Sequence, residues 1–229
     1  MARRLTDGVW LLDLGLVPPF ATNGYLTDDG ELTLVDPGLP WNRPSLRSEM
    51  ADAGYAVGDL DRVLVTHFDL DHSGGLRGLP ADWRGPVYMG TTDAAIARGD
   101  TDPKRRHHKG LFHMFVRRLF PVPEGTTLTD VEDGDEIGAF TAYHTPGHNP
   151  GHMVYLHESG AAFLGDLVWE NGGRLTPPFW LDSYDMRGVH ESIRDLARRV
   201  PPFEVAAMAH GDPITTDGRR ALLDCSARL

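Results

Sequence analysis

The sequence predicts an α/β protein, a sandwich of four layers in which two sheets are each covered by helices. Two observations support this fold class. Short apolar runs bounded by Gly, Asn and Asp alternate with helical patterns, and this alternation occurs twice along the chain. No internal repeat, low-complexity tract or Pro- or Ser-rich linker separates the two halves, so we interpret residues 1–229 as a single domain.

The first half is predicted to begin with strands. Apolar runs between turn residues mark them, at residues 8–14, 24–27, 32–36, 62–66 and 86–89. Apolar residues at helical spacing predict one helix that starts near Pro44 and stops at Gly54, and another over residues 91–98. Residues 104–120 are cationic and aromatic, and we expect them to form a helix interrupted at Gly110.

The second half repeats this order. Apolar runs predict strands at residues 126–131, 139–144, 153–157, 161–165 and 205–209. The clearest helix of the chain is expected over residues 185–200, where Val189, Ile193 and Leu196 belong to one apolar stripe. A last helix is expected over residues 216–223.

Charge and composition exclude several function classes. The net charge of −11 disfavours a nucleic-acid partner, because affinity for nucleic acid comes mainly from Lys and Arg. The single cysteine, Cys225, excludes a disulfide within the chain and a thiolate metal cluster. Asp7 and Asp13 break the N-terminal apolar stretch, so we expect neither a signal peptide nor a membrane partner, and a cytoplasmic location.

The most informative segment follows the strand at 62–66. It places four ligand-type side chains within six residues: His67, Asp69, Asp71 and His72. Side chains two positions apart in an extended segment point the same way, so His67 and Asp69 can hold one ion. Asp71 and His72, after the chain bends, can hold a neighbouring ion. Imidazoles combined with carboxylates suit Zn, Mn or Fe.

Three further strands end in a ligand-type residue. His148 follows a Pro-Gly turn, Asp166 follows the strand at 161–165, and His210 follows the strand at 205–209. Four strand ends that each deliver His or Asp predict a site along one edge of a sheet. A carboxylate such as Asp166 can bridge two cations.

This pattern resembles the metallo-β-lactamase superfamily, whose signature is H-x-H-x-D-H, a later His, a bridging Asp and a final His. The resemblance covers about residues 8–212 and includes the strand-end turn Val35-Asp36-Pro37-Gly38. It implies a four-layer αββα sandwich and two divalent metal ions. In that arrangement the first ion is held by His67, Asp69 and His148, the second by Asp71, His72 and His210, and Asp166 bridges them.

The sequence departs from the family pattern at Asp69, where a second His is usual. An oxygen ligand there adds negative charge and favours harder metals, so Zn is expected but Fe or Mn is left open. The flavodiiron branch of the family has a carboxylate at this position and uses iron. That branch also needs a flavodoxin domain, for which this chain has no room, so redox chemistry is not expected.

The resemblance implies a metal-dependent hydrolase in which a hydroxide shared by two ions attacks a carbonyl carbon. Asp71 is the expected catalytic residue, orienting the hydroxide or carrying its proton to the leaving group. We expect the substrate to be a small ester, lactone or thioester. The alternatives are β-lactam or phosphodiester hydrolysis, or a sensor module in which the metal is structural.

The substrate pocket is expected to have aromatic walls, with Phe115, Trp169 and Trp180 as substrate contacts. We predict that residues 104–120 form a lid whose aromatic face covers the metals while Lys104–Lys109 stay in solvent. The alternative is an ordinary outer helix or a homodimer interface.

Smaller roles are expected for other polar residues near the motifs. Asp212 is expected to orient His210. The histidines at 144 and 152 are expected either to contact the metal ligands from behind or to be structural, and those at 107, 108 and 113 to face solvent.

Overall fold

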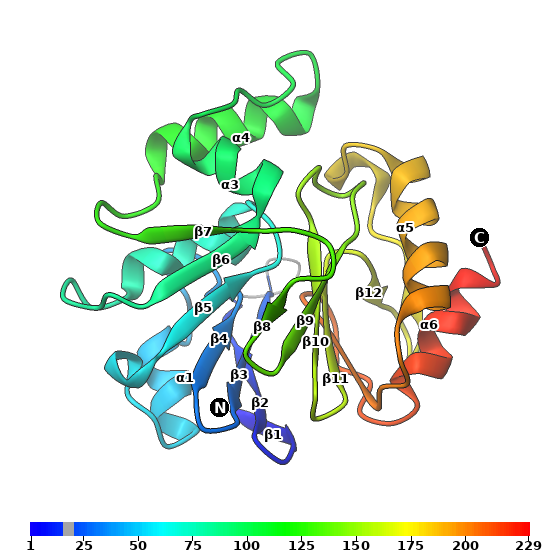
Figure 1. Cartoon of the computed structure of the whole chain (residues 1–229), viewed down its shortest axis with the longest axis horizontal. Coiled ribbons are helices and arrows are strands. Elements are labelled where there is room, and N and C mark those ends of the chain that lie inside the picture. Colours follow the sequence, from blue (N-terminus) through cyan, green and yellow to red (C-terminus); the bar gives the residue numbers. More distant parts are fainter. Residues whose placement is uncertain (16–20) are drawn as a thin grey trace.

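Two sheets lie face to face in the computed structural model, which describes residues 1–15 and 21–229 (Figure 1). The first sheet has seven strands in chain order: β1 (Arg3–Thr6), β2 (Val9–Asp13), β3 (Asn23–Asp28), β4 (Leu32–Val35), β5 (Arg62–Val65), β6 (Pro86–Gly90) and β7 (Thr127–Val131). Its strands are antiparallel from β1 to β4 and parallel from β4 to β7.

The second sheet has the strand order β14-β11-β10-β9-β8. Its strands are β8 (Glu136–Ile137), β9 (Phe140–His144), β10 (Met153–His157), β11 (Ala161–Gly165) and β14 (Val205–Met208). β12 (Trp169–Glu170) and β13 (Leu175–Thr176) form a separate hairpin. The pair β11–β14 is parallel, so both strands end at the same edge of the sheet.

Helices cover the outer face of each sheet (Figure 1). Along the first half they are α1 (Leu46–Asp52), α2 (Leu70–Ser73), α3 (Thr91–Arg98) and α4 (His108–Leu119), and along the second half α5 (Met186–Arg199) and α6 (Gly218–Ser226). Three short 3-10 helices complete the described elements: η1 (Val57–Asp59), η2 (Gly74–Gly78) and η3 (Trp180–Asp182).

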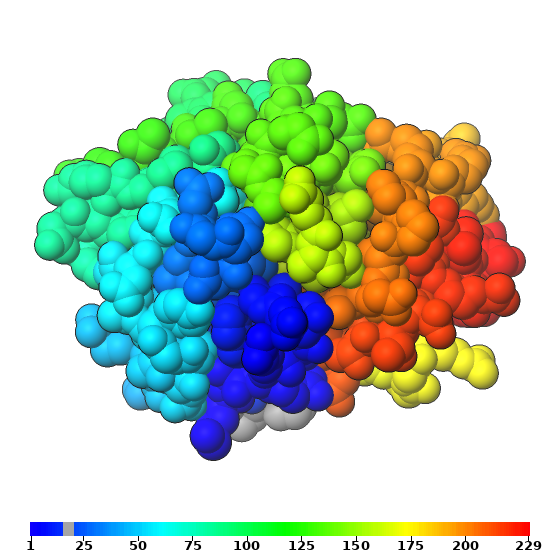
Figure 2. Space-filling view, turned by 60° about the horizontal axis from the view of Figure 1, so that its bottom comes forward, coloured from blue at the N-terminus to red at the C-terminus, as the bar shows by residue number. Residues whose placement is uncertain are grey.

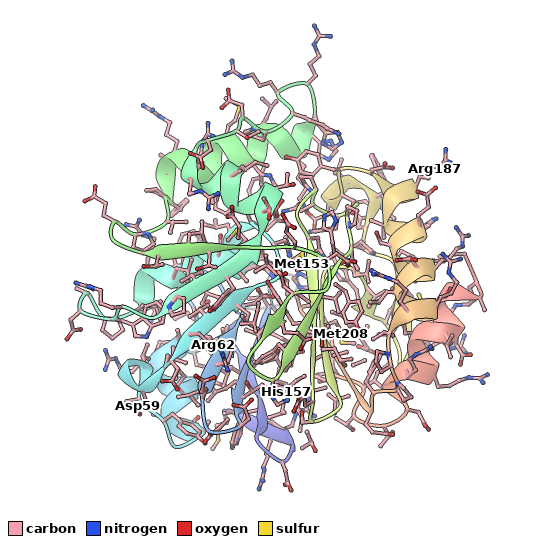
Figure 3. The ribbon with its side chains drawn as sticks, in the orientation of Figure 1. Asp59, Arg62, Met153, His157, Arg187 and Met208 are labelled. Atoms are coloured by element: carbon pink, nitrogen blue, oxygen red, sulfur yellow. The ribbon has the colours of Figure 1, made fainter. Side chains whose placement is uncertain are left out.

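Three apolar clusters separate four layers. One lies between the first sheet and its helices and contains Met50 and Val116. Another lies between the second sheet and the helices α5 and α6, and contains the stripe residue Ile193. The third joins the inner faces of the two sheets and contains Tyr155 and Met153, which is labelled at the centre of Figure 3. The predicted four-layer α/β sandwich is therefore confirmed.

The N-terminal strands connect the two halves. Figure 2 shows the N-terminal residues (dark blue) on the surface between the first half (cyan) and the C-terminal part (orange to red). The Tyr25 hydroxyl donates to the carbonyl oxygen of Met208 at 2.6 Å, and the Asn23 backbone N–H donates to that of Ala209 at 2.8 Å. These bonds hold the end of β14 beside the end of the first sheet.

The expected helices and main strands are present, with one difference in α4. The helix continues through Gly110 and is not interrupted there. A Cβ on Gly110 would lie 2.1 Å from the carbonyl oxygen of Lys104, so the glycine permits a close approach of the preceding turn. β1, β8, β12 and β13 were not predicted, because runs of two to four residues carry little periodicity. In the described part of the chain, every helix is too short or too polar to cross a membrane.

Candidate metal centre

Four strand ends deliver the predicted ligand residues to one place. His67 follows β5, His148 follows β9, Asp166 follows β11 and His210 follows β14 closely. The parallel register of β11 and β14 pairs Gly165 with Met208 and so sets Asp166 near His210. The sequence-based expectation that these residues gather at one edge agrees with this geometry.

The bend expected after Asp69 is a short helix. Asp69 has extended backbone geometry and precedes α2, in which Asp71 and His72 lie on the first turn. The extended and helical parts therefore send their side chains to two adjacent positions. His67 and Asp69 face the first position, and Asp71 and His72 face the second.

The first position is formed by His67, Asp69 and His148, all of which are buried. Asp69 Oδ2 lies 3.4 Å from Nε2 of His67 and 3.4 Å from Nε2 of His148. Ligand atoms about 2.0–2.2 Å from a zinc ion are separated by roughly this distance in a tetrahedral site.

The second position is formed by Asp71, His72 and His210. Asp71 Oδ2 lies 3.6 Å from Nε2 of His72 and 3.5 Å from Nε2 of His210. Asp166 Oδ2 lies between the two positions, 3.4 Å from Nε2 of His210 and 3.5 Å from Nε2 of His148. This is the placement expected of a bridging carboxylate.

Each candidate imidazole is oriented by a contact at its other nitrogen. Nδ1 of His72 lies 2.9 Å from Asp36 Oδ2, and Nδ1 of His210 donates to the Ala21 carbonyl oxygen at 2.8 Å. Nδ1 of His67 lies 3.0 Å from Thr66 Oγ1, and Nδ1 of His148 lies 3.3 Å from Ser183 Oγ. Such contacts fix the ring so that Nε2 faces the centre.

Several buried polar atoms at the centre fit a cation. Nε2 of His67, Nε2 of His72 and Oδ1 of Asp166 are buried without a hydrogen-bond partner among the described residues. Such orphaned atoms are costly unless something binds them. At the second position, burial opposes protonation, but Asp71 and other carboxylates outweigh it and raise the pKa of His72 to about 10. The pKa of His210 is raised to about 9, where Asp166 outweighs burial. The second position therefore attracts positive charge.

The first position contains a side chain that was expected in solvent. Lys109, on the first turn of α4, is only 3% exposed. Its Nζ lies 2.9 Å from Asp69 Oδ2 and 2.7 Å from Nε2 of His148, and donates to the Asp182 carbonyl oxygen at 2.6 Å. The prediction that Lys104–Lys109 all stay in solvent is therefore wrong for Lys109. While the ammonium is there, the first position does not fit a second cation.

His113, one turn after Lys109, is also buried, so its expected solvent-facing position is wrong. Its Nε2 lies 2.7 Å from Asp69 Oδ1, which also accepts from Nδ2 of Asn149 at 3.0 Å. The hydroxyl of Tyr184 lies 2.9 Å from Nδ1 of His113. Although burial opposes it, Lys109 and the neighbouring histidines 67, 113 and 148 hold the pKa of Asp69 well below its usual range. Asn149 was not predicted, although it directly follows His148 in the sequence.

The three expected substrate contacts differ in position. The Trp169 ring meets the His210 ring edge-on, with centroids 5.0 Å apart, so Trp169 borders the second position. Phe115 is 52% exposed and lies on the face of α4 opposite His113, so the expected aromatic lid over the metals is wrong. Trp180 is 61% exposed in η3, where its ring lies 5.7 Å from the Phe179 ring between centroids.

The structure agrees with some of the supporting roles expected for other polar residues and contradicts others. Asp212 is exposed and lies 3.4 Å from the Arg3 guanidinium, so it does not orient His210. His152 is buried, and its Nε2 accepts from the backbone N–H of Asp166 at 3.1 Å, which agrees with a structural role. His144 is exposed, its Nε2 lies 2.9 Å from the Pro150 carbonyl oxygen, and its backbone N–H donates to Asp133 Oδ1 at 2.8 Å.

The αββα sandwich with His and Asp side chains converging at the strand ends defines the class of metal-dependent hydrolases. The chain belongs to the metallo-β-lactamase superfamily, whose sequence profile matches residues 17–210. The resemblance expected from the motifs is thereby confirmed, and so is the prediction of an enzyme.

Individual relatives and structures agree with this membership. The probable metallo-hydrolase YflN of Bacillus subtilis is 24% identical, over 86% of this chain and 81% of its own length. The hydroxyacylglutathione hydrolase GloC of Haemophilus influenzae is 30% identical, over 66% of this chain and 68% of its own length. The crystal structure of the metallo-β-lactamase family protein TTHA1429 from Thermus thermophilus has a TM-score of 0.71 and 23% identity. That match covers 98% of this chain and 80% of TTHA1429. The chain spans 65% to 86% of the length of the first three curated relatives.

Proposed function

We propose that this metal-dependent hydrolase cleaves a small ester, lactone or thioester. The observation that carries the proposal is the convergence of orphaned Nε2 and carboxylate atoms at the edge where the two sheets meet. A divalent ion bound there supplies a Lewis acid and lowers the pKa of bound water. The net charge of −11 favours a small substrate over a polyanion such as nucleic acid.

The second position is the proposed site of that ion, with zinc as the metal to be tested first. Asp71, His72, Asp166 and His210 supply two imidazoles and two carboxylates, a donor set that zinc accepts and that iron or manganese also tolerate. Asp71 is the most exposed of the four, with a side chain 31% accessible, so it can also reach a substrate. It is proposed to accept a proton and to pass it to the leaving group.

Trp169 is the proposed wall of the substrate site. Its ring packs against His210, and its indole Nε1 is buried without a hydrogen-bond partner among the described residues. A buried donor beside a candidate metal ligand can donate to a carbonyl oxygen of a bound substrate. This supports a substrate that presents an oxygen acceptor close to the bond that is cleaved.

A thioester is the first substrate class to test within this range. The relative GloC is named for the hydrolysis of hydroxyacylglutathione, in which the acyl group is bound to sulfur. GloC matches 66% of this chain, so we propose a hydroxyacylglutathione-type thioester as the first substrate to test.

The test uses the zinc-loaded protein on matched thioester, ester, lactone, β-lactam and phosphodiester substrates. Activity toward one of the first three, lost on chelation and restored by zinc, is expected. Asp71→Asn at saturating zinc should lower kcat by about 100-fold or more, because the proton acceptor is removed. Exclusive β-lactam or phosphodiester turnover would replace the substrate assignment, and no turnover of any substrate would favour a metal-binding sensor.

A further inference from the structure

Lys109 is held in the metal centre by three separate groups. Its Nζ contacts Asp69 Oδ2 at 2.9 Å, Nε2 of His148 at 2.7 Å and the Asp182 carbonyl oxygen at 2.6 Å. An ammonium group has three N–H donors, so these three contacts use all of them. The side chain is 2% exposed and lies on the first turn of α4.

Two of these contacts are to atoms of the first metal position. Nε2 of a neutral imidazole has one lone pair, which either accepts a hydrogen bond or coordinates an ion. Nε2 of His148 lies 2.7 Å from Lys109 Nζ, so its lone pair is already engaged. Of the three atoms that define the first position, only Nε2 of His67 is without a hydrogen-bond partner among the described residues.

The other oxygen of Asp69 offers no substitute. Oδ1 accepts from Nδ2 of Asn149 and contacts Nε2 of His113 at 2.7 Å. Oδ2 faces Lys109. The carboxylate is therefore surrounded by donors, and its negative charge is balanced by the ammonium.

The second position has a different environment. Within the described residues, the ion pairs of Asp71 and Asp166 involve only histidines, and none involves Lys or Arg. Among the described residues, a divalent ion at the second position meets two carboxylates and no lysine or arginine. An ion at the first position would meet an ammonium at close range, and the two positive charges repel strongly in a buried site.

We infer that the Lys109 ammonium takes the place of the first metal ion, so that the chain binds one divalent ion, at the second position. The resemblance to the family implied two ions. Lys109 thus provides a fixed positive charge where a binuclear centre would have its first ion. The inference depends on the metal centre and not on the identity of the substrate.

The chain offers a matched control, because it has only two lysines, Lys104 and Lys109. Lys104 is exposed and lies five residues before Lys109. We propose to prepare Lys109→Met, Lys109→Ala and Lys104→Met, dialyse each against zinc, and count bound ions by elemental analysis. Cobalt(II) substitution gives a second count from its absorption spectrum, and neither count requires a substrate.

The wild type and Lys104→Met are expected to bind about one ion, and the Lys109 variants about two, because the lone pair of His148 becomes free. Two ions in the wild type would overturn the inference, as would a single ion in both Lys109 variants. Loss of the ion from both variants would also overturn it, because Lys109 would then be a ligand and not a competitor.

A measurement on the wild type covers the case in which the variants do not fold. Lys109 is expected to resist acetylation with acetic anhydride both in the chelated protein and after zinc addition, while Lys104 reacts in both. Acetylation of Lys109 that appears only when zinc is added would mean that an ion displaces it, and the inference would fail. A loss of esterase or thioesterase activity with these results intact would count against the proposed function alone.

Discussion

The carboxylate of Asp36 and the imidazole of His72 are joined beneath the metal centre, with Oδ2 of Asp36 2.9 Å from Nδ1 of His72. Asp36 follows β4 in a left-handed backbone conformation, with φ of 53°. The parallel register of β4 and β5 brings it beside Thr66, whose backbone N–H and hydroxyl also donate to its carboxylate. One side chain thus ties the end of β4 to the ligand loop and leaves Nε2 of His72 free for an ion.

Asp36→Asn is expected to weaken ion binding about 10- to 100-fold. Asn tolerates the left-handed backbone, so the turn itself should persist. The amide has only one acceptor oxygen, however, and cannot serve three donors as the carboxylate does. Competition with a coloured chelator measures the affinity, and Asp7→Asn on the exposed N-terminal turn is the control. Equal affinity in both variants would show that Asp36 does not support the site.

Gly165→Ala should be more damaging than another glycine substitution at positive φ. An added Cβ would lie 2.8 Å from Nε2 of His152 and 2.8 Å from Oγ1 of Thr66, at the base of the centre. Gly160→Ala is the control, because its φ is also positive but its nearest neighbour is 3.8 Å away. The control should lose about 1–2 kcal/mol from backbone strain, and Gly165→Ala about 1–3 kcal/mol more from overlap. Urea unfolding measures both, and equal losses would contradict the predicted contact.

Trp169→Phe is expected to raise KM about 3- to 10-fold while the ion content stays unchanged, because one hydrogen bond to the substrate is lost. Phe115→Ala is the matched control. Phe115 points away from the centre on α4, so KM should stay within about twofold of the wild type. Steady-state kinetics on the best substrate checks both variants. A larger rise in KM for Phe115→Ala than for Trp169→Phe would favour the interpretation of residues 104–120 as a lid.

The effect of zinc on thermal stability should grow with pH. In the absence of an ion, the raised pKa values of His72 (about 10) and His210 (about 9) mean that both rings are protonated at neutral pH. Protonation stabilises the fold fully below the unfolded pKa of about 6.5, and this contribution is lost as pH rises through 9 and 10. Zinc must displace these protons to bind, so its affinity for the site rises as the pH rises and the two rings become neutral.

The measurement is the difference in Tm between zinc-loaded and chelated protein from pH 6.5 to 10. Contributions from surface groups cancel in this difference, since they are shared by both forms. A difference that is constant over the range would contradict the protonation of these two rings.

Most of the candidate metal ligands could be predicted from the sequence. His67, Asp166 and His210 lie within two residues of the ends of short apolar strands, and a strand of four or five residues is a local pattern. Parallel neighbouring strands end at the same edge of a sheet, so residues at their ends meet without further information. The motif and the alternation of elements therefore predicted both the family and the location of the metal centre.

The contribution of α4 required the tertiary structure. Its sequence, cationic and aromatic, suggested an aromatic face toward the substrate and lysines in solvent. Instead Lys109 and His113 face inward, four residues apart, while Phe112 and Phe115 are exposed. The periodicity of a helix shows which residues share a face, but not which face meets the protein.

That choice depends on partners far away in the chain. Asp69 lies 40 residues before Lys109, and the Asp182 carbonyl lies 73 residues after it. A buried ammonium is stable only where such acceptors surround it, and no local pattern reports whether they do. The sequence by itself predicted which residues converge at the candidate metal centre, because strand ends and the motif that follows β5 are local features. Only the tertiary structure decided that a lysine fills the first position, because its burial depends on three acceptors that folding brings together.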